Sequence, residues 1–248
     1  MKIVTWNCNG ALRKKLEILK ALEADLYVIQ ECENPETLLN DELYTTFSAN
    51  SLWTGDIKSK GLGSFASNGI ILNENKWPTN GLKYFISANV NGAFDLIAAW
   101  AHKANSPTFG YIGQLWKYLQ FHIDKMQNTI IAGDLNSNVR WDRWDRWWNH
   151  SDVVRELSEV KIESLYHMLR KVAQGAELEP TFFLQRNREK AYHIDYIFAS
   201  EILAKATKSL EIGNPDEWLA HSDHLPVIAT LGSYGSQQDL PAALAAVP

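Results

Sequence analysis

The sequence predicts an α/β domain in which two β-sheets face each other and helices cover their outer faces. Three features of the 248-residue chain support this fold class. Short apolar runs, typical of buried strands, alternate with segments whose apolar residues recur at helical spacing. No long Gly-, Ser- or Pro-rich linker separates the two halves, and no repeat of fixed period is present. Two facing sheets would bury all of the apolar strands at once.

Five apolar strands and two helices are expected in the first half of the chain. The first helix, 12–24, places leucines on one face, and the second carries Leu115 and Leu119 in register with Met126. The segment 51–65, with three glycines and two lysines, is interpreted either as a mobile loop that covers substrate or as a flexible connection. The predicted strands lie at 2–6, 26–30, 69–72, 94–101 and 129–134.

The second half of the chain shows the same alternation of predicted strands and helices. Ser151 is the predicted N-cap of a helix that carries Val153 and Leu157. We expect one domain over residues 1–232, followed by a flexible tail at 233–248. Further strands are predicted at 181–184, 192–200 and 226–231.

Composition restricts the class of protein. The 46% hydrophobic and 21% charged residues are typical of a globular chain that folds without disulfides. A net charge of −5 argues against a bulk polyanion binder, although an acidic, cation-loading centre can lie beside a local basic strip. Cys8 and Cys32 are interpreted as buried, reduced side chains. The start of the chain has no signal-peptide pattern and no run of about 18 apolar residues is present, so we expect a cytoplasmic protein that does not contact membranes.

Polar side chains fall where apolar strands end. Loops and edges held by a rigid sheet are common places for functional sites, so these side chains are expected to meet at one sheet edge. They are Asn7, Glu31, His102, Asp134, Asn136, Asp195, Asp223 and His224.

This set of side chains suits phosphoester hydrolysis. Oxygen ligands without a cysteine or multi-histidine cage favour Mg²⁺ or Mn²⁺ over Zn²⁺. Asp134 is predicted to orient or deprotonate an attacking water, while His102 and His224 donate hydrogen bonds to the phosphate. An Asp195–His224 pair would orient the imidazole and stabilise its charged form.

Ordinary structural interpretations stand beside these roles. Asp134 in GDLNSN is also a typical turn residue, and Asn7 is also a typical helix cap. His102 taken alone is more typical of a strand-end histidine with satisfied hydrogen bonds, and the Asp223-His224 pair is equally compatible with a polar surface turn. Asp195 is harder to explain structurally, because an unpaired carboxylate within an apolar strand would be costly.

Five motifs in this order resemble the endonuclease/exonuclease/phosphatase superfamily of exonuclease III- and deoxyribonuclease I-like phosphoesterases. The resemblance implies a four-layer α/β/β/α sandwich, two facing mixed β-sheets flanked by helices, and Mg²⁺- or Mn²⁺-dependent hydrolysis. The motifs are TWNCNG (5–10), IQE (29–31), GDLNSN (133–138), HIDYIF (193–198) and SDHLPV (222–227).

The resemblance also implies roles for individual residues. Glu31 would be the principal metal ligand, Asp223 a further ligand or a close neighbour of the ion, and Asn9 an assisting residue. Asn7 and Asn136 would hold the phosphate and the nucleophilic water, Asp134 would activate that water, and Asp195 would pair with His224.

One departure from the family pattern concerns the segment AWAHKAN (99–105). Abasic-site endonucleases often carry a tyrosine there, whereas His102 resembles the histidine of the deoxyribonuclease and sphingomyelinase branches. A strict abasic-site role is therefore not implied. Tyr111 in FGYIGQ is a weak substitute for that tyrosine.

Two segments are candidates for substrate contact. The stretch 138–154 interleaves four of the ten tryptophans with three arginines, which suits base stacking and backbone contacts or, equally, a helix or loop that packs its rings on the core. The segment 182–193 carries Arg186 and Arg188, as either a phosphate clamp or a solvated turn. The substrate-binding residues predicted from the first stretch are Arg140, Trp141, Arg143, Trp144 and Trp147.

The leading hypothesis is a nuclease, either endo- or exonuclease, that acts on DNA and has no obligate protein partner. A phosphatase or phosphodiesterase for a small molecule or lipid headgroup is the first alternative. A non-catalytic nucleic-acid-binding scaffold is the second.

Overall fold

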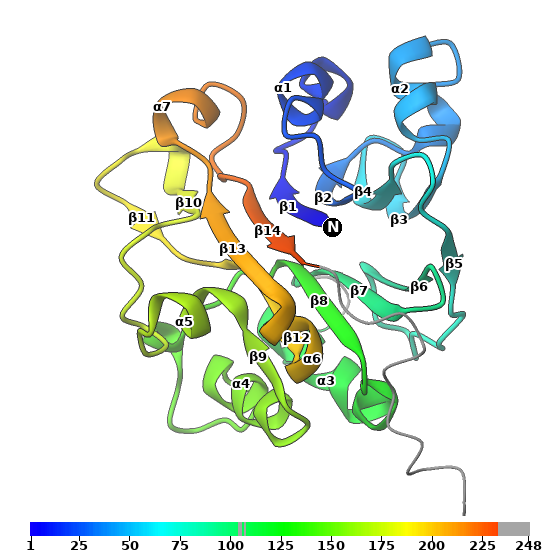
Figure 1. Cartoon of the computed structure of the whole chain (residues 1–248). Coiled ribbons are helices and arrows are strands. Elements are labelled where there is room, and N and C mark those ends of the chain that lie inside the picture. Colours follow the sequence, from blue (N-terminus) through cyan, green and yellow to red (C-terminus); the bar gives the residue numbers. More distant parts are fainter. Residues whose placement is uncertain (104–105, 107, 233–248) are drawn as a thin grey trace, which may run out of the picture.

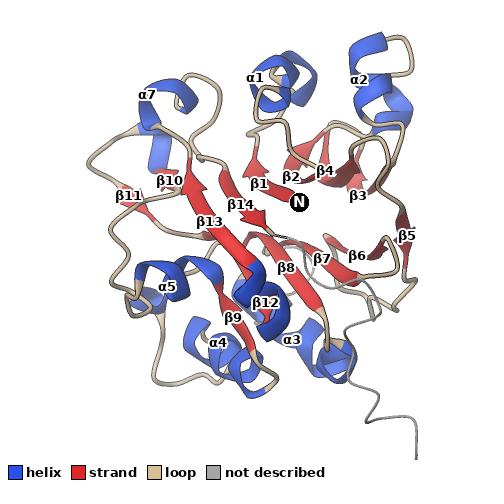
Figure 2. Ribbon diagram, viewed as in Figure 1, coloured by secondary structure: helices blue, strands red, loops and turns tan. Residues whose placement is uncertain are grey.

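Two six-stranded β-sheets face each other at the centre of the molecule (Figures 1 and 2). A computed structural model of the chain describes residues 1–103, 106 and 108–232, so the predicted tail 233–248 lies outside the described residues. A separate two-stranded hairpin pairs β10 (Phe182–Phe183) with β11 (Ala191–Tyr192).

The first sheet has the strand order β13-β14-β1-β2-β4-β3. Its centre pairs β1 with β2 in parallel and β1 with β14 in antiparallel fashion. The strands are β1 (Lys2–Asn7), β2 (Leu26–Cys32), β3 (Ser51–Ile57), β4 (Lys60–Ala66), β13 (Thr207–Ile212) and β14 (Val227–Leu231).

The second sheet has the order β5-β6-β7-β8-β12-β9 and is mixed as well, because β7 and β8 are parallel while the other neighbours are antiparallel. The strands are β5 (Leu72–Glu74), β6 (Phe85–Val90), β7 (Phe94–Trp100), β8 (Thr129–Asp134), β9 (Ile162–Ser164) and β12 (Asp195–Ser200).

The α-helices lie mainly outside the two sheets: α1, α2 and α7 lie at one side in Figure 1, and α3 and α4 at the other. None of the helices in the described part of the chain combines the length and apolar character needed to span a bilayer. The α-helices are α1 (Leu16–Lys20), α2 (Glu42–Phe47), α3 (Ile112–His122), α4 (His150–Glu159), α5 (Leu165–Arg170), α6 (Glu201–Ala206) and α7 (Pro215–Trp218). The short 3₁₀ helices are η1 (Leu12–Lys14), η2 (Pro35–Thr37), η3 (Ile123–Lys125), η4 (Val139–Trp141) and η5 (Leu184–Arg186).

Three buried apolar clusters correspond to the layers. Val28 and Ile130 belong to the cluster between the sheets, to which α5 and α6 also contribute side chains. The second cluster joins α3 and α4 to one sheet, and the third joins Leu16 and Leu19 of α1 to Trp6 of the other. The four-layer α/β/β/α sandwich is therefore confirmed.

Several boundaries differ from the sequence prediction. The segment 12–24 is a 3₁₀ turn followed by a short α-helix, because Lys15 between them has a non-helical conformation (φ −123°, ψ 5°). The N-cap of α4 is Asn149 and not Ser151, since Asn149 forms a reciprocal capping box with Asp152. The predicted strand at 69–72 is wrong except for Leu72, where β5 begins.

The prediction of a loop over 51–65 is wrong, because the segment forms the hairpin β3–β4. Two of its glycines make room for the indole ring of Trp53. A Cβ atom would lie 2.4 Å from that ring at Gly55 and 2.3 Å from it at Gly61. These glycines allow close packing and do not provide a mobile cover for the site.

The predicted strand at 192–200 is interrupted. The backbone N–H groups of Ile194 and Asp195 donate to the hydroxyl of Thr181, so strand pairing breaks after β11 and resumes in β12. The break leaves Asp195 as the first residue of β12, at the edge where the polar side chains gather.

The two cysteines are unpaired and buried in the cluster around Trp6, as expected. Burial raises the pKa of the Cys8 thiol to about 12, and burial also raises the pKa of Cys32. Thiolates are the reactive form of cysteine, so neither side chain is suited to redox chemistry.

Replacing Gly133 with Ala should destabilise the protein, because an added Cβ would lie 1.7 Å from the carbonyl oxygen of Ala99 on β7. We expect a loss of at least about 3 kcal/mol in the free energy of unfolding, measured by urea denaturation. Gly110→Ala is the matched control, since the nearest atom to its Cβ would be 3.5 Å away. Equal stability of the two variants would contradict this account of β8.

Candidate active site

Six of the eight predicted strand-end residues form one connected group at the edge where both sheets meet. Asn7 of the first sheet donates from Nδ2 to Asp134 Oδ2 of the second sheet over 3.0 Å. The same amide lies 3.4 Å from Glu31 Oε1. Asn136 Nδ2 donates to Asp134 Oδ2 over 3.0 Å, and its backbone N–H donates to Asp134 Oδ1 over 2.8 Å. Asp134 therefore accepts hydrogen bonds from two amide side chains and one backbone group.

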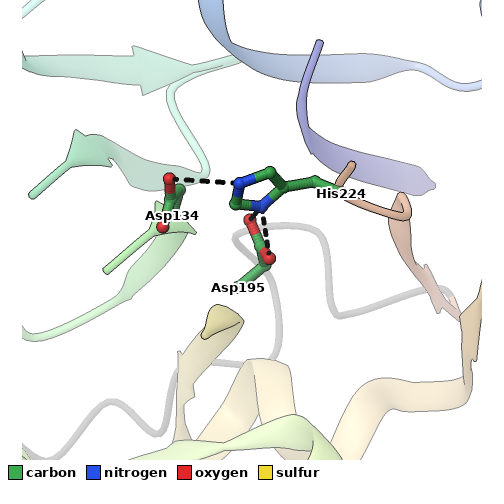
Figure 3. A group of neighbouring side chains, drawn as sticks. All are labelled: Asp134, Asp195 and His224. Carbon is green, nitrogen blue, oxygen red and sulfur yellow. Dashed lines mark hydrogen bonds and ion pairs between the residues drawn. The ribbon is translucent and has the colours of Figure 1, made fainter. Parts of the chain in front are cut away.

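The remaining two members form an Asp–His–Asp arrangement with Asp134 (Figure 3). His224 Nδ1 lies 3.0 and 3.1 Å from the two carboxylate oxygens of Asp195 and donates to them. Its Nε2 lies 4.0 Å from Asp134 Oδ2. All three side chains are buried, and their ligand-type atoms lie within 4.8 Å of one another.

The electrostatics of this group favour a charged imidazole. Burial alone would lower the pKa of His224, but the Asp195 and Asp134 carboxylates outweigh it and raise that pKa to about 9. Burial raises the pKa of Asp134 to about 7, although the nearby His224 opposes the rise. A carboxylate whose pKa lies near neutrality is suited to accept a proton during catalysis.

Residues that the sequence analysis missed hold this arrangement in place. Thr181 Oγ1 donates to Asp195 Oδ2 over 2.7 Å, so that this carboxylate accepts from the threonine hydroxyl as well as from His224. Ser222 Oγ donates to the Asn7 carbonyl and accepts from the His224 backbone N–H. Ser222 is the first residue of the SDHLPV motif, so the sequence could have identified it, whereas Thr181 lies in no motif.

Glu31 reaches the group through a β-bulge. The pairing of β2 with β4 shifts between Gln30 and Cys32, and Glu31 has a φ of 63°. Regular alternation would turn Glu31 to the face of Ile29, which packs with Cys32 on the helix side of the sheet. The bulge instead directs Glu31 to the site.

Lys60 at the start of β4 is a further residue that no motif identified. Its Nζ lies 2.7 Å from Glu31 Oε2 and 5.9 Å from the centre of the Trp100 ring. The lysine side chain is 43% exposed and Glu31 16% exposed, so the pair opens toward solvent. The ammonium group of Lys60 is thus the charged partner of Glu31 in the described chain.

The donor atoms distinguish two parts of the site with respect to a metal ion. Asp195 is completely enclosed, and both its oxygens already accept hydrogen bonds from Thr181 and His224. The Asp–His–Asp group is therefore better described as a hydrogen-bonded cluster than as a metal cage. Glu31 has an accessible carboxylate with one long amide contact and a displaceable lysine, which fits a divalent cation held by oxygen ligands.

The other predicted metal-site and phosphate-site residues lie around this group. Burial lowers the pKa of His102, and Glu31 and Lys60 both affect it, which places His102 beside that pair. Asp223 is half-buried and adjoins His224 in the chain. The Asn9 side chain is exposed, while its backbone N–H donates to Asn7 Oδ1 over 3.0 Å. A metal-binding role for Asp223 and Asn9 stays a prediction.

The predicted substrate-binding tryptophans are mostly exposed. Trp144 is 98% exposed, Trp147 is 63% exposed and Trp141 is 42% exposed. Trp148 is half-buried, since it packs at 4.7 Å on Phe109. The exposed rings do not fit the alternative in which all of them pack on the core.

The neighbouring arginines lack acidic partners in the part of the chain that the structure describes. Arg140 donates to the Gly175 carbonyl, and Arg146 donates to Asn149 Oδ1 and the Trp141 carbonyl. No side-chain partner is described for Arg143. The arginines found in ion pairs are Arg13, Arg155, Arg170 and Arg188.

The second candidate segment for substrate contact, 182–193, carries Arg186 and Arg188. Arg188 pairs with Asp216 at the surface. Arg186 is exposed. Contact of either arginine with substrate stays a prediction.

Comparison with known proteins identifies the fold. No protein-family model and no curated protein sequence matches the chain. The 3′-5′ exonuclease NExo from Neisseria meningitidis matches with a TM-score of 0.67 at 19% identity, covering 94% of this chain and 100% of that one. A 3′ phosphatase structure of NExo from Neisseria, bound to a product DNA hairpin, matches with a TM-score of 0.69 at 18% identity and the same coverage. An AP endonuclease from Archaeoglobus fulgidus matches with a TM-score of 0.64 at 22% identity, again with the same coverage.

The chain has the endonuclease/exonuclease/phosphatase fold. The family resemblance drawn from the five motifs is thus confirmed at the level of the fold. All five motifs lie on strands or strand ends of this fold, and each supplies at least one residue of the connected group. The individual roles inferred for those residues stay predictions.

Stability of the metal-free protein should fall as the pH rises from about 6.5 to 9. The folded state holds the His224 proton more tightly than the unfolded state, whose histidine pKa is about 6.5, so this contribution is complete below that pH and lost near pH 9. The pKa of Asp134 is also raised, so its contribution to stability falls with rising pH as well, up to about pH 7. Urea unfolding in EDTA should show a loss of roughly 2–3 kcal/mol. In Asp195→Asn the slope should flatten, and an unchanged slope would contradict the assignment.

Replacing Lys60 with Met should strengthen binding of a divalent cation, because the ion no longer has to displace an ammonium group from Glu31. For a partly exposed pair we expect roughly two- to five-fold tighter Mn²⁺ binding, measured by calorimetry without substrate. Lys58→Met, an exposed lysine on the same hairpin, is the matched control. Weaker or unchanged binding in Lys60→Met would show that the lysine does not compete with the ion.

Proposed function

We propose that the chain is a Mg²⁺- or Mn²⁺-dependent phosphodiesterase that acts on DNA as a nuclease. The observation that carries this proposal is the Asp134–His224–Asp195 cluster next to Glu31. A buried acid–base pair and an accessible oxygen ligand are what phosphodiester hydrolysis requires. The names of the structural neighbours, an exonuclease, a 3′ phosphatase with a DNA hairpin and an AP endonuclease, support the same chemistry.

In this proposal Asp134 accepts the proton of the attacking water. Asn7 and Asn136 hold its carboxylate in one orientation, and its pKa of about 7 leaves a substantial ionised fraction at neutral pH. His224 is protonated at that pH, and its Nε2–H is directed at a phosphoryl oxygen while Asp195 holds Nδ1. When bound at Glu31, a divalent cation would neutralise charge on the phosphoryl oxygens.

DNA as the substrate is supported by the surface beside the cluster. Residues 139–147 follow the GDLNSN motif and present exposed Trp144 and Trp147 together with arginines that have no described acidic partner. Aromatic faces stack on bases of any sequence, and arginines bind the phosphate backbone. A local cationic surface of this kind is compatible with the net charge of −5.

A phosphatase or phosphodiesterase for a small phosphoester is the second candidate, favoured by the position of His102 beside Glu31 and Lys60. A non-catalytic scaffold would need none of the buried titratable cluster. A cytoplasmic location and the absence of an obligate protein partner stay predictions.

Removal of either central carboxylate should abolish cleavage of DNA. We expect Asp134→Asn to lower the turnover number by about 10²–10⁴-fold, because it removes the proton acceptor but keeps its shape. Glu31→Gln should lose activity that high Mn²⁺ partly restores. The measurement is Mg²⁺- or Mn²⁺-dependent cleavage of labelled duplex and single-stranded oligonucleotides, with and without an abasic site.

Glu163→Gln, an exposed carboxylate on β9, is the control that should keep full activity. If the unmodified protein leaves all DNA intact but hydrolyses bis(p-nitrophenyl) phosphate, the small-molecule candidate replaces the nuclease. DNA binding with a steep salt dependence and no cleavage of any ester would favour the scaffold.

A further inference from the structure

Three surface cavities of the described chain differ in charge. One of about 170 Å³ is lined by Arg140 and Glu177 among others. One of about 290 Å³ is lined by His167 and Glu163. The third and largest, of about 380 Å³, is lined by Arg143 and Arg146 and by no acidic residue of the described chain. Sites for small ligands typically have volumes of roughly 300–1,000 Å³, so the first cavity is too small, while the second lies at the lower limit and carries the Glu163 carboxylate in its lining.

The carboxylate in the smallest cavity excludes it as an anion site. Glu177 is ionised at neutral pH, because hydrogen bonds to His167 and to backbone N–H groups outweigh its burial and lower its pKa to about 2. A phosphate there would meet a fixed negative charge. The third cavity, which we call the arginine cavity, has the opposite potential.

The arginine cavity adjoins the active site. Its wall includes Asn136, whose side chain donates to Asp134 Oδ2 over 3.0 Å, and Ser137 next to it. A group that contacts Asn136 in the cavity would thus be separated from Asp134, the proposed proton acceptor, by the Asn136 side chain. A substrate that reaches from the active site into the arginine cavity needs a second binding group close to its scissile phosphate.

The loop that carries the two arginines is held rigidly. Asn149 is buried, accepts from the backbone N–H of Arg143 and from Arg146 Nε, and donates to the carbonyls of both arginines. Asp142, which could have neutralised them, instead accepts from the backbone N–H groups of His150 and Ser151 at the start of α4. The backbones of both arginines and the Arg146 side chain are therefore held in place, and neither arginine has an acidic partner among the described residues.

Tyr111 also lines the arginine cavity. It has φ 55° and ψ −124°, a backbone conformation that non-glycine residues rarely adopt, and its ring is 47% exposed. Strain of this kind is typical of functional sites. Trp141 lines the cavity as well, so two aromatic rings accompany the two guanidinium groups.

We propose that the arginine cavity binds the nucleotide next to the scissile phosphate. Arg143 and Arg146 bind the second phosphate of that nucleotide, and Tyr111 and Trp141 contact its base or sugar. This rests on the proposed nuclease function and deepens it: the substrate must carry a second phosphate one nucleotide away. Simple phosphomonoesters and small diesters lack that group, so they would occupy the catalytic cluster alone.

The test compares ligands with one and two phosphates. Calorimetric titration in EDTA should show that thymidine 3′,5′-bisphosphate binds the unmodified protein and that Arg143→Gln weakens binding by about ten-fold or more, with a further loss in Arg143→Gln/Arg146→Gln. Arg143→Gln is informative alone, because the Arg143 side chain makes no described contact that holds the loop. Arg155→Gln, which removes an exposed arginine on α4 paired with Asp152, is the matched control and should bind like the unmodified protein.

Kinetics supply the second measurement. Arg143→Gln should raise the KM for a duplex oligonucleotide about ten-fold with little change in kcat, and should leave hydrolysis of bis(p-nitrophenyl) phosphate unchanged. Unchanged bisphosphate affinity, or an equal loss on both substrates, would overturn the proposal. If the unmodified protein cleaves no DNA, the nuclease function fails, and the titration alone still decides whether the cavity binds a nucleotide.

Discussion

The hydrogen bond from Asn7 to Asp134 is the interaction on which the site depends, because it joins the last residue of β1 to the last residue of β8 across two different sheets. Asp134, Asp195 and His224 are buried together, and a buried charge without partners would cost several kcal/mol. Each of these three side chains therefore restricts the positions that the other two can take. The sheets can pack in one relative position only, since a shift of either would separate His224, preceding β14, from Asp195 on β12. Packing of the apolar layer between the sheets and formation of the cluster are two consequences of the same arrangement.

Three residues at the candidate site or at the cavity beside it have a backbone with positive φ, as have several residues elsewhere in the described chain. Glu31, Asn136 and Tyr111 all have positive φ values. Each conformation of this kind costs of order 1–3 kcal/mol and persists only where the surroundings impose it. Here the surroundings are buried β-strands, the capping box of α4 and the packing of Trp53 against glycines of the β3–β4 hairpin. The stability of the sandwich thus supports a site whose own residues are not in their preferred conformations.

Charge is distributed so that an acidic chain presents cations where an anionic substrate would bind. Lys60 lies on Glu31, His224 is held protonated, and Arg143 and Arg146 line a cavity beside Asn136. Asp142, between those arginines and Arg140, does not neutralise them, because its carboxylate accepts hydrogen bonds from the backbone of α4. Local potential, and not net charge, is what a bound phosphate would experience.

The layers of the fold and the residues of the candidate active site could be predicted from the sequence alone. Apolar runs that end at Asn7 and Asp134, and a further run interrupted by Asp195, predict strands whose polar residues meet, and the five motifs predict which side chains take part. The tertiary structure alone decided the rest. The bulge at Glu31, the lysine that pairs with it and the cavity next to Asn136 depend on contacts between segments far apart in the chain, which leave no periodic or local pattern. The glycines of 51–65 were misread for the same reason, because what they accommodate is the ring of Trp53 across a hairpin and not a turn.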